Sequence, residues 1–218
     1  MKPLLVFDLD GTLIDSAKDI AVALNWVLNH HNKPAIAHEK VVEHIGDGLR
    51  KLLLDFFPEN SNDERLQLQL ENEFFSAYDR EMFTHTQVFP GVKNFLDSWD
   101  GPIGIITNKN ERPAREVIQH LGLAQYAWVE IFGADTLSEK KPSPLPLYRM
   151  MEKAQYQAQH TIMIGDGRPD ILSAVAAGTK SLAIGFGYTD AKILVELGAQ
   201  AVLEHYDHMP QALKKFGY

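Results

Sequence analysis

Short apolar runs alternate with amphipathic stretches along most of this chain. Each run is bounded by Gly, Pro, Asp or Asn, which is typical of strands buried on both faces of a parallel sheet. These runs cover residues 4–7, 103–106, 129–132, 161–164 and 181–184, with a weaker one at 201–203. Helical spacing of apolar residues follows at 111–121, 144–158, 170–177 and 191–197. Alternating strands and helices predict an α/β fold, with helices on both faces of a parallel sheet.

One long stretch, residues 15–83, interrupts this alternation because its apolar residues follow helical spacing only. Ser16 is placed to cap the first helix of this stretch, and further helical patterns begin near Leu49 and Asp63. We therefore predict a helical cap domain at residues 15–83, inserted into an α/β core domain that comprises residues 1–14 and 84–218.

Composition and charge narrow the possible partners. Of the 218 residues, 45% are hydrophobic, which indicates a globular protein with a real core. The net charge of −8 argues against nucleic acid or anionic membrane as a partner. The sequence contains 0 cysteines, which excludes disulfides, thiolate zinc sites and cysteine nucleophiles. No apolar stretch approaches the ~20 residues needed to cross a bilayer, and early aspartates do not fit a signal peptide, so we expect a cytoplasmic protein.

Two aspartates stand directly behind the first apolar run. Because side chains alternate along an extended chain, Asp8 and Asp10 point the same way while Leu9 points into the core. Gly11 then allows a sharp turn or a close approach to a ligand. Taken alone, these residues are equally compatible with a plain polar turn and with a ligand site.

Polar side chains also follow other predicted strands. Thr107 and Asn108 follow one, Asp166 and Asp170 follow another, and Lys141 lies in a proline-rich loop. Since ligands bind beyond the carboxyl ends of parallel strands, we expect these groups to gather at one edge of the sheet. Carboxylates at such short distances repel one another unless a cation lies among them. Oxygen ligands without Cys or His point to Mg²⁺ rather than zinc.

These residues resemble the four motifs of a known family, the haloacid dehalogenase-like (HAD) hydrolases. The matching segments are, in order, Asp8-Leu9-Asp10-Gly11-Thr12, Thr107-Asn108, Lys141-Pro142, and Asp166 with Asp170. The resemblance spans essentially the whole chain and implies a Rossmann-like three-layer core. The helical insert looks like the cap of phosphoglycolate phosphatases and β-phosphoglucomutases. The fourth motif departs from the family pattern at Gly167 and Pro169, but neither change removes a metal ligand.

The resemblance implies roles for the central residues. Asp8 would be the nucleophile and form an aspartyl-phosphate, which divides one difficult hydrolysis into two easier steps. Asp10 would act as general acid and then as general base, and Lys141 would supply a fixed positive charge. The ligands of Mg²⁺ would be Asp8, Asp166 and the backbone carbonyl of Asp10, and Asp170 would order metal-bound water or Lys141.

Substrate contacts are expected from both domains. Thr107 and Asn108 would hold phosphate oxygens. Arg50, in a cap segment similar to one that faces the site in phosphoglycolate phosphatases, fits a substrate contact and a surface cation equally well, and Lys109 is a similar case. Lys140 is interpreted only as a solvated neighbour of Lys141.

The resulting prediction is a Mg²⁺-dependent phosphatase for a small phosphorylated metabolite, with phosphoglycolate as the first substrate to test. Asp10 favours phosphate ester chemistry, because dehalogenases of the family lack an aspartate two residues after the nucleophile. A phosphomutase that reuses the aspartyl-phosphate is the main alternative, and a non-catalytic binding protein on the same fold is a third. A monomer and a homodimer both stay open.

Overall fold

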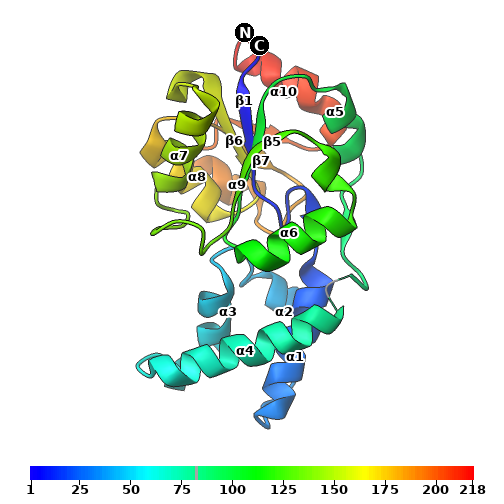
Figure 1. Ribbon diagram of the computed structural model, residues 1–218, viewed down its shortest axis with the longest axis vertical. Coiled ribbons are helices and arrows are strands. Elements are labelled where there is room, and N and C mark those ends of the chain that lie inside the picture. Colours follow the sequence, from blue (N-terminus) through cyan, green and yellow to red (C-terminus); the bar gives the residue numbers. More distant parts are fainter. Residues whose placement is uncertain (82) are drawn as a thin grey trace.

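A parallel β-sheet forms the centre of the protein in the computed structural model, which describes residues 1–81 and 83–218 (Figure 1). Within these residues the sheet has six strands in the order β5-β4-β1-β6-β7-β8. The strands are β1 (Leu4–Phe7), β4 (Ile103–Ile106), β5 (Trp128–Phe132), β6 (Thr161–Gly165), β7 (Lys180–Ile184) and β8 (Ala201–Leu203). Each pairs in parallel with its neighbour, and β1 lies between β4 and β6. The predicted α/β fold class is confirmed.

Helices cover both faces of this sheet. Leu5 and Phe7 pack in one apolar cluster with α5, α6 and α10, whereas Leu4 and Val6 pack in another with α7 and α8. This alternation explains why β1 is an unbroken apolar run, since both of its faces are buried. The helices are α5 (Val92–Ser98), α6 (Glu111–His120), α7 (Leu145–Ala154), α8 (Arg168–Ala177), α9 (Ala191–Glu196) and α10 (Met209–Lys215).

A helical insert, formed by α1 to α4, lies at the end of the molecule opposite both chain termini (Figure 1). Its helices are α1 (Ala17–His30), α2 (His38–Val42), α3 (Leu49–Phe56) and α4 (Glu64–Glu81). The insert has its own apolar cluster, in which Leu24, Val27 and Phe57 are almost completely buried. The domain boundaries at 14/15 and 83/84 stay predictions, and residue 82 of the predicted cap domain lies outside the described residues.

Two connections join the insert to the sheet, and they contact each other. The short strands β2 (Ile14–Asp15) and β3 (Gln87–Val88) pair antiparallel, with Ile14 opposite Val88. Buried Asp19, in the first turn of α1, accepts hydrogen bonds from the backbone N–H groups of His85 and Thr86 and from the Thr86 hydroxyl. The two connections therefore form one small structured unit, which the sequence pattern did not indicate.

Several predicted details differ from the structure. The short helices α2, α5 and α10, of five to seven residues, were not predicted, although α9, which is equally short, was. Ser16 occupies the position that precedes α1, as expected, but its hydroxyl donates to Asp10 at 2.5 Å and does not cap the helix. Among the described residues, no helix is long and apolar enough to cross a membrane.

The separate apolar cluster of the insert leads to a stability prediction. Leu24 is fully buried in that cluster, so Leu24→Ala should reduce the free energy of unfolding by about 2–5 kcal/mol through lost burial and an unfilled cavity. Val22 lies on the same helix with 37% of its surface exposed, and Val22→Ala should change stability by less than about 0.5 kcal/mol. Urea unfolding followed by circular dichroism measures both. Equal losses would contradict a packed core in the insert.

Candidate functional site

The carboxyl ends of the central strands bring the predicted polar residues together. Asp8 follows β1, Thr107 follows β4 and Asp166 follows β6, the three strands at the middle of the sheet. Their parallel register aligns Phe7 with both Ile105 and Ile164, so the strands end at similar heights. The three side chains are buried although they are polar. Such burial needs compensating partners, because an unpaired polar group in the interior is costly.

Lys141 supplies the main compensation for the buried negative charge. Its ammonium group donates to Asp170 Oδ1 at 2.5 Å and to the Ile106 carbonyl at 2.6 Å, and lies 2.9 Å from Asp8 Oδ1. Burial disfavours the charged amine, but the adjacent Asp170 and Asp8 carboxylates outweigh this and raise the pKa of Lys141. Lys141 therefore stays protonated and holds a fixed positive charge beside Asp8.

Asp166 adds a further carboxylate to this group. Its oxygens accept hydrogen bonds from the Thr12 hydroxyl at 3.0 Å and from the Tyr188 backbone N–H at 2.8 Å. Oxygens of Asp8, Asp166 and Asp170 lie within 4.8 Å of one another. Burial, and then the charges of Asp8 and Asp170, raise the pKa of Asp166 well above its ordinary value. A bound cation would relieve this repulsion.

The donor set suits a hard divalent cation. It consists of carboxylate oxygens, the ligands that such ions prefer. Asp8 Oδ1 is buried and lies 2.9 Å from the Lys141 ammonium group, but among the described residues it accepts no well-aligned hydrogen bond. Asp170 accepts from Lys141 and the Gly167 N–H, and Asp166 accepts from Thr12 and the Tyr188 N–H. The three carboxylates together are the described group that could hold such an ion.

Asp10 faces a different set of partners from Asp8. It accepts a hydrogen bond from Ser16 Oγ, and both of its oxygens lie 3.2 Å from the ammonium group of Lys109. Lys109 also lies over the ring of Tyr78 in α4, 4.7 Å from the ring centre. The Asp10 side chain is therefore oriented toward the helical insert and lies outside the group of carboxylates around Lys141.

Asn108, in the predicted second motif, and Lys140, next to the third, contact the insert. The Asn108 side-chain amide donates to the Gly46 carbonyl at 2.9 Å and to the Lys141 carbonyl at 3.0 Å. The Lys140 ammonium group donates to the Asp47 carbonyl at 2.6 Å, so interpreting Lys140 as only a solvated neighbour was wrong. Gly48 completes this contact, because a Cβ there would lie 2.6 Å from Lys140 Nζ.

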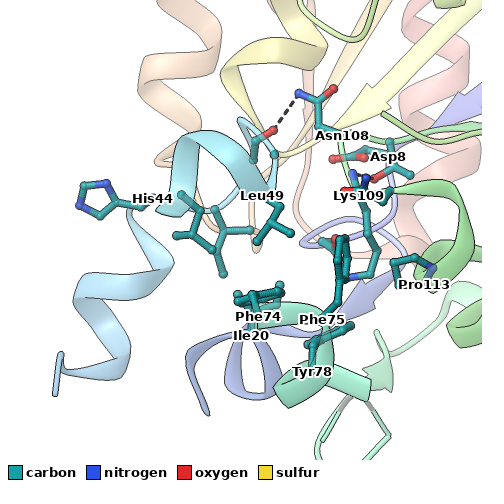
Figure 2. A pocket seen from close by; sticks show the side chains of 17 residues that line it. Asp8, Ile20, His44, Leu49, Phe74, Phe75, Tyr78, Asn108, Lys109 and Pro113 are labelled. Carbon is teal, nitrogen blue, oxygen red and sulfur yellow. Dashed lines mark hydrogen bonds and ion pairs between the residues drawn. The ribbon is translucent and has the colours of Figure 1, made fainter. Parts of the chain in front are cut away.

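A cavity of about 70 Å³ lies between the sheet edge and the insert. Figure 2 shows Asp8, Asn108 and Lys109 on its polar side and the apolar side chains of Ile20 and Phe74 on the other. Further lining residues are Asp10, Thr107, Leu49, Leu52, Phe75, Tyr78 and Pro113. A small ligand in this cavity would meet the reactive carboxylate at one end and apolar side chains of the insert at the other.

Arg50 lies outside this cavity lining in the described residues. It is partly exposed and pairs with Glu71 at 2.6 Å and with Glu64 at 3.1 Å. Of the two cations considered as substrate contacts, Lys109 lines the cavity and Arg50 does not. The sequence could not separate them, because the direction of a helical side chain depends on how α3 and α4 pack.

Other residues near the site were missed by the sequence reasoning. Thr12 and Tyr188 both bind Asp166, and Ser16 binds Asp10. Thr12 belongs to the first motif, but the resemblance implied no role for it. The sequence did contain a signal for Tyr188. Gly185 and Gly187 lie between the end of β7 and Tyr188, and glycines at a strand end often permit a close backbone approach.

Comparisons with known proteins agree on a family. A family model described as "Haloacid dehalogenase-like hydrolase" matches residues 5–184. Two curated relatives are called phosphoglycolate phosphatase. The one from Chromobacterium violaceum is 37% identical over 212 residues, 94% of this chain and 95% of its own. The one from Neisseria gonorrhoeae is 39% identical over 197 residues, 87% and 83% of the two chains.

Solved structures share the fold. A crystal structure described as a predicted phosphoglycolate phosphatase from Haemophilus somnus 129pt superposes with a TM-score of 0.88 at 24% identity, covering 97% of this chain and 98% of the other. A crystal structure described as a "Putative haloacid dehalogenase-like hydrolase" from Bacteroides fragilis also gives 0.88, at 21% identity, with 96% of this chain and 100% of the other covered. At these identities the likeness establishes the architecture alone.

The close approach of Gly11 to Asp166 leads to a prediction about cation binding. A Cβ at Gly11 would overlap the Asp166 carboxylate, so Gly11→Ala must displace that carboxylate. We expect the affinity for a divalent cation to fall by about 10- to 100-fold. Titration calorimetry with MgCl₂ measures this.

Gly178 offers a matched control for this change. Both glycines have a left-handed φ, +81° for Gly11 and +70° for Gly178, so alanine causes similar backbone strain at either position. A Cβ at Gly178 would meet no atom within 4 Å, so Gly178→Ala should leave cation affinity unchanged. If both variants bound the cation like the original protein, Asp166 would not be a ligand.

Proposed function

Because this chain belongs to the haloacid dehalogenase-like hydrolases, we propose that it is a Mg²⁺-dependent phosphatase that hydrolyses a small phosphorylated metabolite through an aspartyl-phosphate. One observation carries the proposal: Asp8 lines the cavity beside the buried Lys141 ammonium group and has an oxygen free of aligned donors. A carboxylate held in this way is a suitable nucleophile for phosphorus. The proposal includes a cytoplasmic location, because the expected substrate is a soluble metabolite.

The first chemical step would transfer the phosphoryl group to Asp8. An Asp8 oxygen bonds to phosphorus while the bond from phosphorus to the substrate oxygen breaks. Asp10, which lines the same cavity, donates a proton to the leaving oxygen. Lys141 is held in place by Asp170 and stabilises negative charge on the attacked group. The alcohol then departs and leaves an aspartyl-phosphate.

The second step would release phosphate. Asp10 is now ionised and accepts a proton from a water molecule, whose oxygen bonds to phosphorus as the bond to Asp8 breaks. This step restores both carboxylates to their starting states. Ser16 and Lys109 hold the Asp10 side chain on the insert side of the cavity, where the leaving group and the water would be.

Mg²⁺ is the cation that best fits the site within this proposal. Asp8, Asp166 and the backbone carbonyl of Asp10 would hold it, and Asp170 would keep Lys141 oriented. When bound, the ion would neutralise the carboxylates and reduce their repulsion toward a phosphate anion. Thr107 and Asn108 line the cavity, and the Thr107 hydroxyl and the Asn108 backbone N–H would donate to the phosphoryl oxygens, since the Asn108 side-chain amide already donates to two carbonyls.

Phosphoglycolate is the first substrate to test, since the relatives carry its name. Its carboxylate requires a cation within the cavity, and Lys109, which is paired with Asp10, is the described lysine that lines it. Arg50 would have to leave Glu64 and Glu71 before it could contact substrate. A screen of phosphate esters should record both phosphate release and isomerised product, because a phosphomutase would give the second without the first.

Removal of the nucleophile is the direct test of the proposed chemistry. Asp8→Asn keeps the size of the side chain but removes its nucleophilic oxygen, so kcat should fall on the order of 10⁴- to 10⁶-fold with Mg²⁺ present. Phosphate release is the assay, and circular dichroism checks the fold. Asp207→Asn, at an exposed carboxylate, is the control that should keep full activity. Steady turnover by pure Asp8→Asn protein would rule out the covalent route.

The two candidate cations can be separated by comparing substrates. For Lys109→Met, we expect kcat/KM for phosphoglycolate to fall about 10- to 100-fold more than for an alkyl phosphate that lacks a carboxylate, because a charge-assisted hydrogen bond is lost. The ratio between substrates corrects for any effect through Asp10, because both leaving groups are alkoxides that need its proton. Arg50→Met should leave that ratio within about twofold. The reverse result would assign the substrate carboxylate to Arg50.

A further inference from the structure

The first helix of the insert is capped by a residue from a distant part of the chain. Tyr188 Oη accepts hydrogen bonds from the backbone N–H groups of Ser16 at 2.9 Å and Ala17 at 3.1 Å. These groups begin α1, where N–H groups have no partner within the helix. A serine before a helix usually satisfies such groups itself, but the Ser16 hydroxyl is bound to Asp10. Tyr188 therefore provides the shorter capping bonds from the sheet side, beside a longer bond of 3.4 Å from the Ala17 N–H to Asp15 Oδ1.

The same residue also contacts the proposed cation site. The Tyr188 backbone N–H donates to Asp166 Oδ2 at 2.8 Å. The backbone beside Tyr188 lies so close to Asp166 that a Cβ on the neighbouring Gly187 would overlap the Asp166 side chain. One residue thus bonds through its backbone to a carboxylate of the site and through its side chain to the start of the insert.

The Tyr188 hydroxyl remains neutral and acts as a donor as well as an acceptor. It donates to Asp15 Oδ1 at 3.0 Å. Burial, followed by the nearby charges of Asp10 and Asp15, raises the pKa of Tyr188, so the hydroxyl keeps its proton. All of its bonds therefore converge on residues 15–17, which form the first connection between sheet and insert.

We propose that Tyr188 is a positioning residue that ties this connection to Asp166 and so holds the insert closed over the cavity. Any rotation of α1 about residues 15–17 must stretch or break bonds to the Tyr188 hydroxyl. Closed and open arrangements then differ by the free energy of those bonds. The kinetic part of this inference rests on the proposed phosphatase function, whereas the structural part does not.

Tyr188→Phe is the variant that isolates the hydroxyl. Phenylalanine keeps the ring and the backbone N–H to Asp166 but cannot bind Asp15, Ser16 or Ala17. The closed state should become less populated, which lowers apparent substrate affinity by the same fraction. We expect KM to rise about fivefold, as for loss of a helix-capping bond, while kcat changes less than about twofold. A group that merely fills space would not produce this separation of KM from kcat.

Amide hydrogen exchange tests the structural part without substrate or metal. In Tyr188→Phe the amides of Ser16 and Ala17 should exchange about five- to tenfold faster, with the change confined to the two connections. Tyr156→Phe is the matched control, because its hydroxyl binds the Lys2 carbonyl, outside the site, and its loss should alter neither these amides nor KM.

The possible outcomes separate this inference from the proposed function. Unchanged exchange at Ser16 and Ala17, or an increase spread evenly over the chain, would overturn the role of Tyr188. Faster exchange with unchanged KM would also overturn it, because the insert would then close without the hydroxyl. If the unmodified protein hydrolysed no phosphate ester with Mg²⁺, the proposed function would fail, and hydrogen exchange would still decide whether Tyr188 holds α1.

Discussion

The buried ion pairs between Lys141 and its two aspartates place strict demands on the surrounding chain. An ammonium group in the interior is stable only beside negative charge, and Asp8 and Asp170 need the ammonium group for the same reason. Strand β1 must therefore end where Asp8 can meet the loop that carries Lys141. The parallel sheet satisfies this demand, because neighbouring strands end at one edge. Adding Asp166 without another cation leaves excess negative charge, which is the physical reason for expecting a metal there.

Chemistry and recognition are divided between two parts of the molecule. The sheet edge supplies the charged groups, and the insert supplies an apolar wall that includes Ile20 and Phe74. Lys109 lies at the boundary, bound to Asp10 on one side and in contact with the Tyr78 ring on the other. Closing the insert would thus both complete the cavity and remove water from Asp10, which strengthens electrostatic interactions there.

The sequence predicted the middle of the sheet well because strands β1, β4 and β6 are buried on both faces. An apolar run such as residues 4–7 has few alternatives, and the bounds of β1 and β4 were found without error. The gathering of Asp8, Thr107 and Asp166 followed from topology alone. Contacts between sheet and insert could not be predicted, because they depend on how two separately packed clusters meet. The partners of Ser16 and Lys140 are of this kind, and both differed from the local expectation. Arg50 pairs within the insert, with Glu64 and Glu71 of α4, which matches the surface role that was one of its two expected roles.

The contacts at residues 46–48 have a consequence for how this protein can vary in evolution. Asn108 and Lys140 bind the carbonyls of Gly46 and Asp47, and every amino acid carries a carbonyl. The hydrogen bond at position 47 therefore survives any substitution there, whereas loss of the Asp47 carboxylate would remove only its attraction for the Lys140 ammonium group. Position 48 favours glycine, because its φ of +90° strains other residues and a Cβ there would lie 3.0 Å from the Asn108 carbonyl oxygen. Substitutions can thus accumulate at position 47 while the glycine and the backbone attachment stay the same.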